Sequence, residues 1–245
     1  MRDFNSYSTE YKNLDFENKQ VLYRKKFELE LIEKIQAKKI LEIGCGLLPI
    51  YKFLEDFDRI EIIEPCKEFF EAIENDKERP GNIRVFSQTL EEVDKNKISA
   101  PDLVLVSSVL HEVEEPRFFL EKLRNLLPSG TKILINVPNA ESLHRKLAKS
   151  MGLIGKTSEL SITNQKMQQF RVYDEASLVK ELSAAGFKTL NTETIFVKPF
   201  THKQMEQMLK FKIIDESVLD GLYDLAKQLT GIGSEICNYC EVIDG

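Results

Sequence analysis

The sequence predicts an α/β protein built on a doubly wound, mostly parallel β-sheet, and three observations lead to this fold class. Short apolar runs alternate with amphipathic stretches of helical length, which is typical of a parallel sheet with helical crossovers. The run 101–108 contains four consecutive apolar residues, 103–106, as expected of a strand buried on both faces. The chain of 245 residues is long enough for one such domain with added helices.

Seven segments have the short apolar character of strands. They are 40–43, 60–63, 82–86, 101–108, 131–137, 187–197 and 235–243. Apolar residues spaced three or four apart among charged ones, or a suitable length between two strands, predict helices for other segments. These are 16–36, 49–57, 68–75, 116–127, 174–185, 201–211 and 215–230. Pro80-Gly81, Pro128-Ser129-Gly130 and Gly186 each follow a predicted helix and end it.

A Gly-x-Gly turn directly follows the first predicted strand. The run 39–46 ends in Gly44-Cys45-Gly46, and the second strand ends eighteen residues after Gly46 (64 − 46), at Glu64. A strand, a glycine turn, a helix and a second strand that closes on a carboxylate can hold a nucleoside by its ribose hydroxyls. The sequence therefore predicts a nucleoside site at this edge of the sheet.

The same turn argues against a dinucleotide. A pyrophosphate site calls for a third glycine, and the chain has Pro49 near that place. The carboxylate of Glu42 lies beside the turn, where it would repel phosphate oxygens and favour a cationic ligand. S-adenosylmethionine carries a sulfonium and an ammonium and has no phosphate. A nicotinamide oxidoreductase is accordingly disfavoured.

The pattern E-x-G-x-G at 42–46, with an acid at the end of the second strand, resembles the class I S-adenosylmethionine-dependent methyltransferases, over about 39–197. The motif of 102–116, D-x-V followed by L-x-H-x-x-x-P, is similar to the strand-four motif of that class. The resemblance implies S-adenosylmethionine as cofactor and a seven-stranded sheet with an antiparallel last strand between strands five and six. The cofactor-binding residues that it implies are Glu42, Gly44, Cys45, Gly46, Glu64, Pro65, Gln88, Thr89, Leu90, Ser107 and Ser108. Gln88 stands where many members have an aspartate for the adenine amino group.

The resemblance implies a single methyltransferase domain over 1–245. Its expected parts are an N-terminal helical cover (1–38), a cofactor-binding core (39–138), a lid insertion (139–172) and the C-terminal half of the sheet (173–245) with a helical insertion at 199–230. In the cover, Tyr7, Tyr11 and Arg24 either close over the cofactor or lie on the surface.

Methyl transfer to a hydroxyl requires a proton acceptor, and histidine is suited to that task. Of the three histidines, His111 and His144 fall on loops at the expected catalytic edge, whereas His202 begins a peripheral helix. We predict that His111 or His144 is the base; the alternative for each is a structural role. The acidic run at 112–115 is typical of a solvated surface, so no metal site is predicted.

Four cysteines stand at positions 45, 66, 237 and 240. Cys237 and Cys240 have C-x-x-C spacing, but no second pair or nearby histidine completes a zinc site. In a strand these two side chains point to opposite faces. We therefore expect buried, reduced thiols.

The net charge of −6 and a pI of about 5.4 disfavour a nucleic acid partner. No apolar run approaches the length that spans a bilayer, and the N-terminus lacks the apolar core of a signal peptide. The expectation is a cytoplasmic enzyme with neither a nucleic acid nor a membrane partner.

The segment 137–146 resembles the UbiG-like branch of bacterial methyltransferases that act on sugars or nucleotide-linked sugars in polysaccharide biosynthesis. The chain is thus predicted to be an O-methyltransferase acting on a small polar acceptor of that kind. An amine, a quinone-like acceptor and a catalytically silent cofactor-binding partner subunit stay open as alternatives. So does the oligomeric state, a homodimer included.

Overall fold

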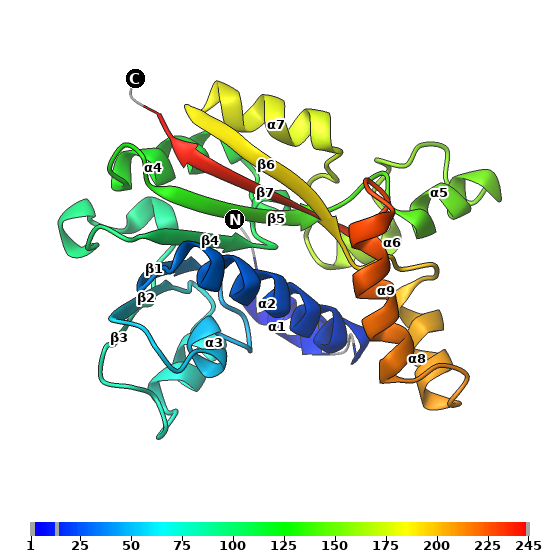
Figure 1. The fold of residues 1–245 in the computed structure, drawn as a ribbon, viewed down its shortest axis with the longest axis horizontal. Helices are drawn as coiled ribbons and strands as arrows, with labels where there is room; N and C mark the ends of the chain where they lie inside the picture. The colour runs from blue at the N-terminus through cyan, green and yellow to red at the C-terminus, as the bar shows by residue number, and fades with distance from the viewer. Residues whose placement is uncertain (1–2, 13–14, 244–245) are drawn as a thin grey trace.

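The structure of the protein is a computed structural model that describes residues 3–12 and 15–243. A seven-stranded sheet in the order β3-β2-β1-β4-β5-β7-β6 forms its centre, with helices on both faces (Figure 1). The strands are β1 (Lys39–Ile43), β2 (Arg59–Ile63), β3 (Ile83–Phe86), β4 (Leu103–Ser107), β5 (Lys132–Pro138), β6 (Phe187–Ile195) and β7 (Glu235–Val242). The predicted fold class is confirmed.

The last strand lies where the predicted fold places it. Strands β1 to β5 pair in parallel, whereas β7 is antiparallel to both of its neighbours, β5 and β6. All seven predicted strands are present, with ends that differ by one or two residues. The prediction of an antiparallel strand inserted between strands five and six is also confirmed.

The helices flank the sheet, and two helical segments, 139–172 and 199–230, project from it. The helices are α1 (Phe4–Lys12), α2 (Asp15–Ile35), α3 (Lys67–Glu74), α4 (Pro116–Leu126), α5 (Leu143–Ser150), α6 (Ile162–Lys166), α7 (Glu175–Ala184), α8 (His202–Lys210) and α9 (Glu216–Gln228). The predicted helix 49–57 is wrong, because only a 3₁₀ turn, Ile50–Phe53, forms there. Helices α1, α5 and α6 are not among the predicted helix ranges; they form within the expected helical cover (1–38) and lid insertion (139–172). No helix of the described ranges has both the length and the apolarity to cross a bilayer.

The core consists of two apolar layers, one on each face of the sheet. Helices α4 and α7 pack on one layer, and α2 and α9 pack on the other (Figure 1). Alternate residues of β4 enter opposite layers, Val104 and Val106 on one side and Leu103 and Leu105 on the other. This confirms that β4 is buried on both faces. At about 25 cal/mol per Å² of apolar area, these layers are the main source of stability.

Candidate functional site

A cavity of about 240 Å³ lies at the carboxyl ends of β1, β2 and β4. At this point the chain leaves β1 toward β2 on one side, while β4 lies on the other. Open α/β sheets bind ligands in the crevice at such a switch point. The predicted site residues that line the cavity are Gly44, Cys45, Gly46, Glu64, Pro65, Thr89, Leu90, Ser107 and Ser108.

The glycine turn is possible only because both glycines lack a side chain. Gly44 and Gly46 have φ angles of 72° and 58°, in the left-handed region that other residues rarely adopt. A Cβ on Gly44 would lie 2.5 Å from Cγ2 of Val109. The turn therefore brings bare backbone to the edge of the cavity.

Glu64 presents a buried carboxylate at the end of β2. Its Oε1 accepts a hydrogen bond from the amide of Cys66 (2.9 Å), and its Oε2 accepts one from the amide of Gly46 (3.1 Å). Burial raises the pKa of Glu64, although these two amides oppose the rise. Oε2 also accepts a weak hydrogen bond from Cys45 Sγ (3.5 Å), so one of the roughly four lone-pair sites is open on Oε1 and one on Oε2 is held only by a thiol. Two adjacent hydroxyls would match this arrangement.

Two of the predicted cofactor contacts do not line the cavity. Glu42 is buried behind the turn, where its carboxylate accepts from Lys25 Nζ (2.7 Å) and from the amide of Ile50 (2.9 Å). Burial raises the pKa of Glu42, and the Lys25 charge opposes that rise. Gln88 also lies outside the lining, although its neighbours Thr89 and Leu90 belong to it.

Ser108 holds the loop after β4 in a strained conformation. Its φ of 58° is unusual for a residue with a side chain, and such strain persists only where neighbours impose it. Here Ser108 donates its amide to the carbonyl of Asn136 (2.9 Å) and its hydroxyl to the side-chain oxygen of Asn136 (3.2 Å). The loop therefore turns toward the cavity between β4 and β5.

Helix α1 covers the cavity with aromatic side chains. Tyr7 and Tyr11 line it, 5.8 Å apart between ring centroids, and Tyr11 lies 5.9 Å from the ring of Phe69 on α3. The Tyr11 hydroxyl lies 3.7 Å from the point where a Cβ of Gly46 would stand. Burial raises the pKa of Tyr11. Of the two placements open for these tyrosines, the structure has the one over the pocket.

Beneath the cavity, α2 carries a buried charged network that the sequence analysis missed. Arg24 donates to both carboxylate oxygens of Glu235 (2.8 and 2.6 Å) and to Glu17 (3.0 Å). Lys25 binds Glu28 (2.9 Å) as well as Glu42. Both cations also line the cavity, and each is neutralised by two carboxylates.

The charged positions along α2 contained a signal for this network. Glu17, Gln20, Arg24 and Glu28 recur at three- and four-residue spacing, which places them on one face of the helix. A charged face of this kind is usually solvated. Its partner Glu235 lies far away in sequence, at the start of β7, so only the fold shows that the face is buried.

His111 lies on the 3₁₀ turn after β4 and is buried. Its Nε2 is 3.7 Å from Oε1 of Glu112, and its carbonyl accepts a hydrogen bond from the amide of Phe170 (3.0 Å). His111 is not among the residues that line the cavity, whereas Glu112 is. The imidazole therefore stands next to a lining carboxylate.

His144 lies on α5 and, like His111, is not part of the cavity lining. Its buried Nδ1 has no hydrogen-bond partner among the described residues. Burial, followed by the nearby charges of Lys198 and His202, lowers its pKa to about 2. His144 is consequently neutral across the physiological pH range.

His202 is less peripheral than predicted. Its Nδ1 lies 3.1 Å from Lys198 Nζ, and its Nε2 lies 3.1 Å from a carboxylate oxygen of Glu17. Burial lowers its pKa, and Lys198 adds to that effect. His202 thus extends the buried charged network of α2 toward α8.

The four cysteines are buried free thiols. Cys237 belongs to one apolar layer and Cys240 to the other, which confirms that they point to opposite faces of β7. Within 3–12 and 15–243, no three His, Cys, Asp or Glu side chains lie close enough together to hold a metal ion.

Comparison with known proteins identifies a matching protein family and a related sequence. A family model described as a methyltransferase domain matches residues 17–192. An uncharacterized protein of Methanocaldococcus jannaschii is 26% identical over 204 residues, which cover 80% of this chain and 86% of that protein.

Two solved structures similar to this chain contain S-adenosylhomocysteine. The N-methyltransferase NodS of Bradyrhizobium japonicum has a TM-score of 0.58 at 12% identity and covers 98% of this chain and 100% of its own. The plantazolicin methyltransferase BpumL has a TM-score of 0.62 at 14% identity, with 96% and 90% covered. The [4+2]-cyclase SpnF is also similar, with a TM-score of 0.52 at 12% identity over 84% of this chain and 74% of its own. At these identities the likeness is one of fold.

Proposed function

The chain belongs to the methyltransferase domain family, and from that premise we propose that it binds S-adenosylmethionine in the cavity at the carboxyl ends of β1, β2 and β4 and transfers the methyl group to a small acceptor. One observation carries the proposal. The buried carboxylate of Glu64 and the left-handed turn at Gly44 and Gly46 line the same cavity. When bound, the cofactor supplies an electrophilic methyl group on a sulfonium.

The residues present fit this cofactor. Glu64 has one open lone pair on Oε1 and one on Oε2 that only the weak Cys45 thiol donor occupies, and ribose hydroxyls could bind at these two positions. The bare turn at Gly44 and Gly46 leaves room beside them. Carboxylates outnumber cations in and below the cavity, which suits a ligand with two positive charges. Ser107 and Ser108 line the opposite side.

The chain's own residues have three tasks in such a transfer. The turn and Glu64 position the donor, because an in-line displacement needs the reacting atoms about 3 Å apart. Tyr7 and Tyr11 exclude water from above. His111 then accepts the acceptor's proton through Glu112, which lines the cavity and lies 3.7 Å from the imidazole.

We favour His111 over His144 as the base. An imidazole whose pKa is about 2 binds a proton weakly near neutral pH, so His144 is poorly suited to general-base catalysis. His144 also lies among Lys198 and His202, whose charges oppose its protonation. His111 has instead a carboxylate neighbour that lines the cavity, Glu112, whose Oε1 lies 3.7 Å from its Nε2.

The charge of the cavity bears on the acceptor. Glu64, Glu91, Glu112 and Glu114 line it, against two cations that are already paired. A nucleotide-linked sugar would bring phosphates into this field, whereas an amine or an uncharged sugar would not. The proposed acceptor is therefore an amine, with the hydroxyl of a free sugar as the second candidate.

The test is to incubate the protein with S-adenosylmethionine and separate pools of amines, free sugars, nucleotide sugars and quinols. Mass spectrometry would look for adenosylhomocysteine release matched by one added methyl group. Glu64→Gln should weaken adenosylhomocysteine binding about 10- to 100-fold, because it removes a charged hydrogen-bond acceptor. Glu71→Gln, on the exposed face of α3, is the matched control.

Each outcome has a distinct meaning. A methylated amine supports the proposal in full. A product in the nucleotide-sugar pool contradicts the electrostatic argument but keeps the enzyme. Adenosylhomocysteine binding without any product indicates a catalytically silent partner subunit. Absence of binding overturns the assignment of the cavity itself.

A further inference from the structure

The most exposed large apolar side chains of the described residues all lie in two helical segments that project from the sheet, 139–172 and 199–230. Five of them are more than three-fifths exposed: Met151 (62%), Leu153 (69%), Ile162 (75%), Phe211 (69%) and Ile213 (68%). Elsewhere the most exposed large apolar side chain is Phe118, on α4, at 49%. Exposed apolar groups in neighbouring segments mark an interaction site more often than scattered single ones do.

Two basic segments carry four of these five side chains. We define the α5 tip as residues 145–156, which hold four basic residues and no acidic one, although the carboxylate of Glu159 accepts hydrogen bonds from the amides of Gly155 (2.8 Å) and Lys156 (3.4 Å). We define the α8 tip as residues 208–214, with the sequence Met-Leu-Lys-Phe-Lys-Ile-Ile, which again lacks an acidic residue. Both tips therefore combine positive charge with exposed apolar side chains, in a chain whose net charge is −6.

Some of this charge is already used within the fold. Arg145 donates to the backbone carbonyls of Thr157 and Glu159 and so holds the α5 tip in shape, and Lys146 pairs with Glu141 (3.2 Å). Four exposed lysines remain, and none of them forms an ion pair with any described residue. They are Lys149, Lys156, Lys210 and Lys212.

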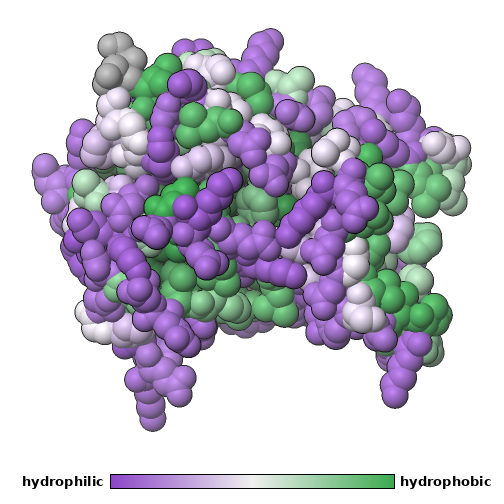
Figure 2. Space-filling model, in the orientation of Figure 1, coloured by the Kyte–Doolittle hydropathy of each residue, from purple (hydrophilic) through white to green (hydrophobic). Residues whose placement is uncertain are grey.

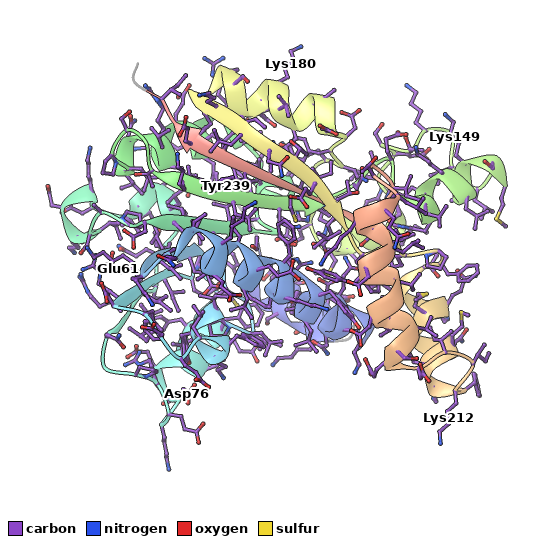
Figure 3. All side chains as sticks on the ribbon, viewed as in Figure 1. Glu61, Asp76, Lys149, Lys180, Lys212 and Tyr239 are labelled. Atoms are coloured by element: carbon purple, nitrogen blue, oxygen red, sulfur yellow. The ribbon has the colours of Figure 1, made fainter. Side chains whose placement is uncertain are left out.

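The two tips lie at the same end of the molecule. Helices α5 and α8 both reach the same end of its long axis (Figure 1). Apolar surface and hydrophilic side chains lie side by side over this end in the space-filling view (Figure 2). Lys149 points upward and Lys212 downward in this view, so the two side chains project from opposite sides of this end (Figure 3). The two tips therefore flank one end of the molecule.

We propose that the protein docks peripherally on bilayers of anionic lipid through the α5 tip and the α8 tip. Met151, Leu153, Phe211 and Ile213 enter the boundary between headgroups and acyl chains, while the four lysines bind anionic headgroups. Basic segments with exposed apolar side chains have this mode of binding. A nucleic acid backbone would use the lysines but leave the apolar side chains in water. Docking of this kind would place the protein at a membrane surface, and it does not depend on the proposed methyl transfer.

The experiment is flotation of the full chain with vesicles of phosphatidylcholine alone and of phosphatidylcholine mixed equally with phosphatidylglycerol. Binding is expected only to the anionic vesicles and should weaken as salt is raised. One lysine near an anionic surface adds a factor of about 5 to partitioning, so K149Q/K212Q should bind about 25-fold more weakly. L153S/F211S should lose about tenfold or more, because two apolar anchors are gone.

Matched controls separate the tips from the general surface. Lys180→Gln, on the exposed face of α7 and away from both tips (Figure 3), should bind like the unchanged protein. Phe118→Ser removes an exposed aromatic side chain outside the tips. Circular dichroism would check that every variant is folded.

Three results would overturn the proposal. One is equal binding to both kinds of vesicle, or to neither. Another is a loss in Lys180→Gln as large as that in K149Q/K212Q. The third is a concentration-dependent dimer abolished by L153S/F211S in the absence of lipid, which would make the tips an interface between two copies of the chain.

Discussion

At the residue scale, the cavity depends on the glycine at position 44. Gly44→Ala would place a side chain in the left-handed region and 2.5 Å from Val109. We expect the free energy of unfolding to fall by about 2–4 kcal/mol, from backbone strain and overpacking together. Adenosylhomocysteine affinity should fall with it, by about tenfold or more, because the turn must shift. Calorimetric titration and chemical unfolding would measure both.

The control for this variant is Gly81→Ala. Gly81 has open space around its Cα and no left-handed backbone, so alanine there should leave stability and affinity nearly unchanged. Equal effects of the two substitutions would contradict the role given to the turn.

A second prediction at this scale concerns the neutral His144. Its pKa is held near 2 in the folded state, whereas an unfolded histidine binds a proton below about pH 6.5. Stability from this residue is therefore complete above pH 6.5 and is lost as the pH falls, by about 1 kcal/mol per unit. His144→Gln should make the decline between pH 6.5 and 5 shallower.

Denaturant unfolding at several pH values, followed by circular dichroism, would show this difference. Part of the decline should persist in the variant, because the pKa of His202 is also lowered. An unchanged slope would mean that His144 is solvated and titrates normally.

At the scale of elements, α1 acts as a cover held by aromatic contacts. Tyr11→Ala removes the ring that lies against Phe69 and over Gly46. We expect adenosylhomocysteine to bind about tenfold more weakly, while the sheet remains folded, since α1 adds no strand to it. Phe118→Ala on α4 removes an exposed ring elsewhere and is the control in calorimetric titration. Equal losses in both variants would argue against a cover.

Helix α2 shows why a pattern that usually indicates a solvated face can mark a buried one. Its charged face meets Glu235 of β7, Glu42 of β1 and Lys198, so each buried charge has a partner. A buried ion is tolerated when its partners and hydrogen bonds offset the loss of water. The resulting network joins the cavity floor to α8 through Lys198 and His202.

At the scale of the whole molecule, ligand binding and folding are coupled. A ligand that binds only the folded state adds about 2.7 kcal/mol at a concentration of 100 times its Kd. For a chain of 245 residues this should raise the melting temperature by about 5–10 °C. Thermal unfolding with adenosylhomocysteine would measure the shift, and NADH at the same concentration should give none. A shift with NADH alone would favour a dinucleotide site.

The two tips also belong to this scale. The sequence led to the expectation of no membrane partner, because no apolar run approaches the length that spans a bilayer. Lys149 and Lys212 are 63 positions apart in the sequence (212 − 149), and only the fold brings them to one end of the molecule (Figure 3). The net charge is a sum over the whole chain, so it does not show that these basic residues lie at one end of the molecule.

Local sequence patterns, with the family resemblance, were sufficient to predict the strands, the position of the antiparallel last strand and the ligand-binding edge of the sheet. Apolar runs and glycine turns are local signals, and parallel pairing then brings Gly44, Glu64 and Ser107 to one edge without further information. The prediction of a helix at 49–57 was based on its length alone, and a segment of that length need not form a helix; only the 3₁₀ turn Ile50–Phe53 forms there. Helix α1 escaped prediction because its few apolar residues pack only against the finished pocket.

Which side chains face the cavity became clear only from the folded chain. It placed Glu42 behind the turn on Lys25, gave His111 a carboxylate neighbour and left His144 neutral among cations. These outcomes depend on burial and on charges from segments that are distant in the sequence, so they cannot be predicted from the sequence alone. The physical reason is that strand formation follows from nearest neighbours, whereas pKa values and side-chain contacts follow from everything packed within a few ångströms.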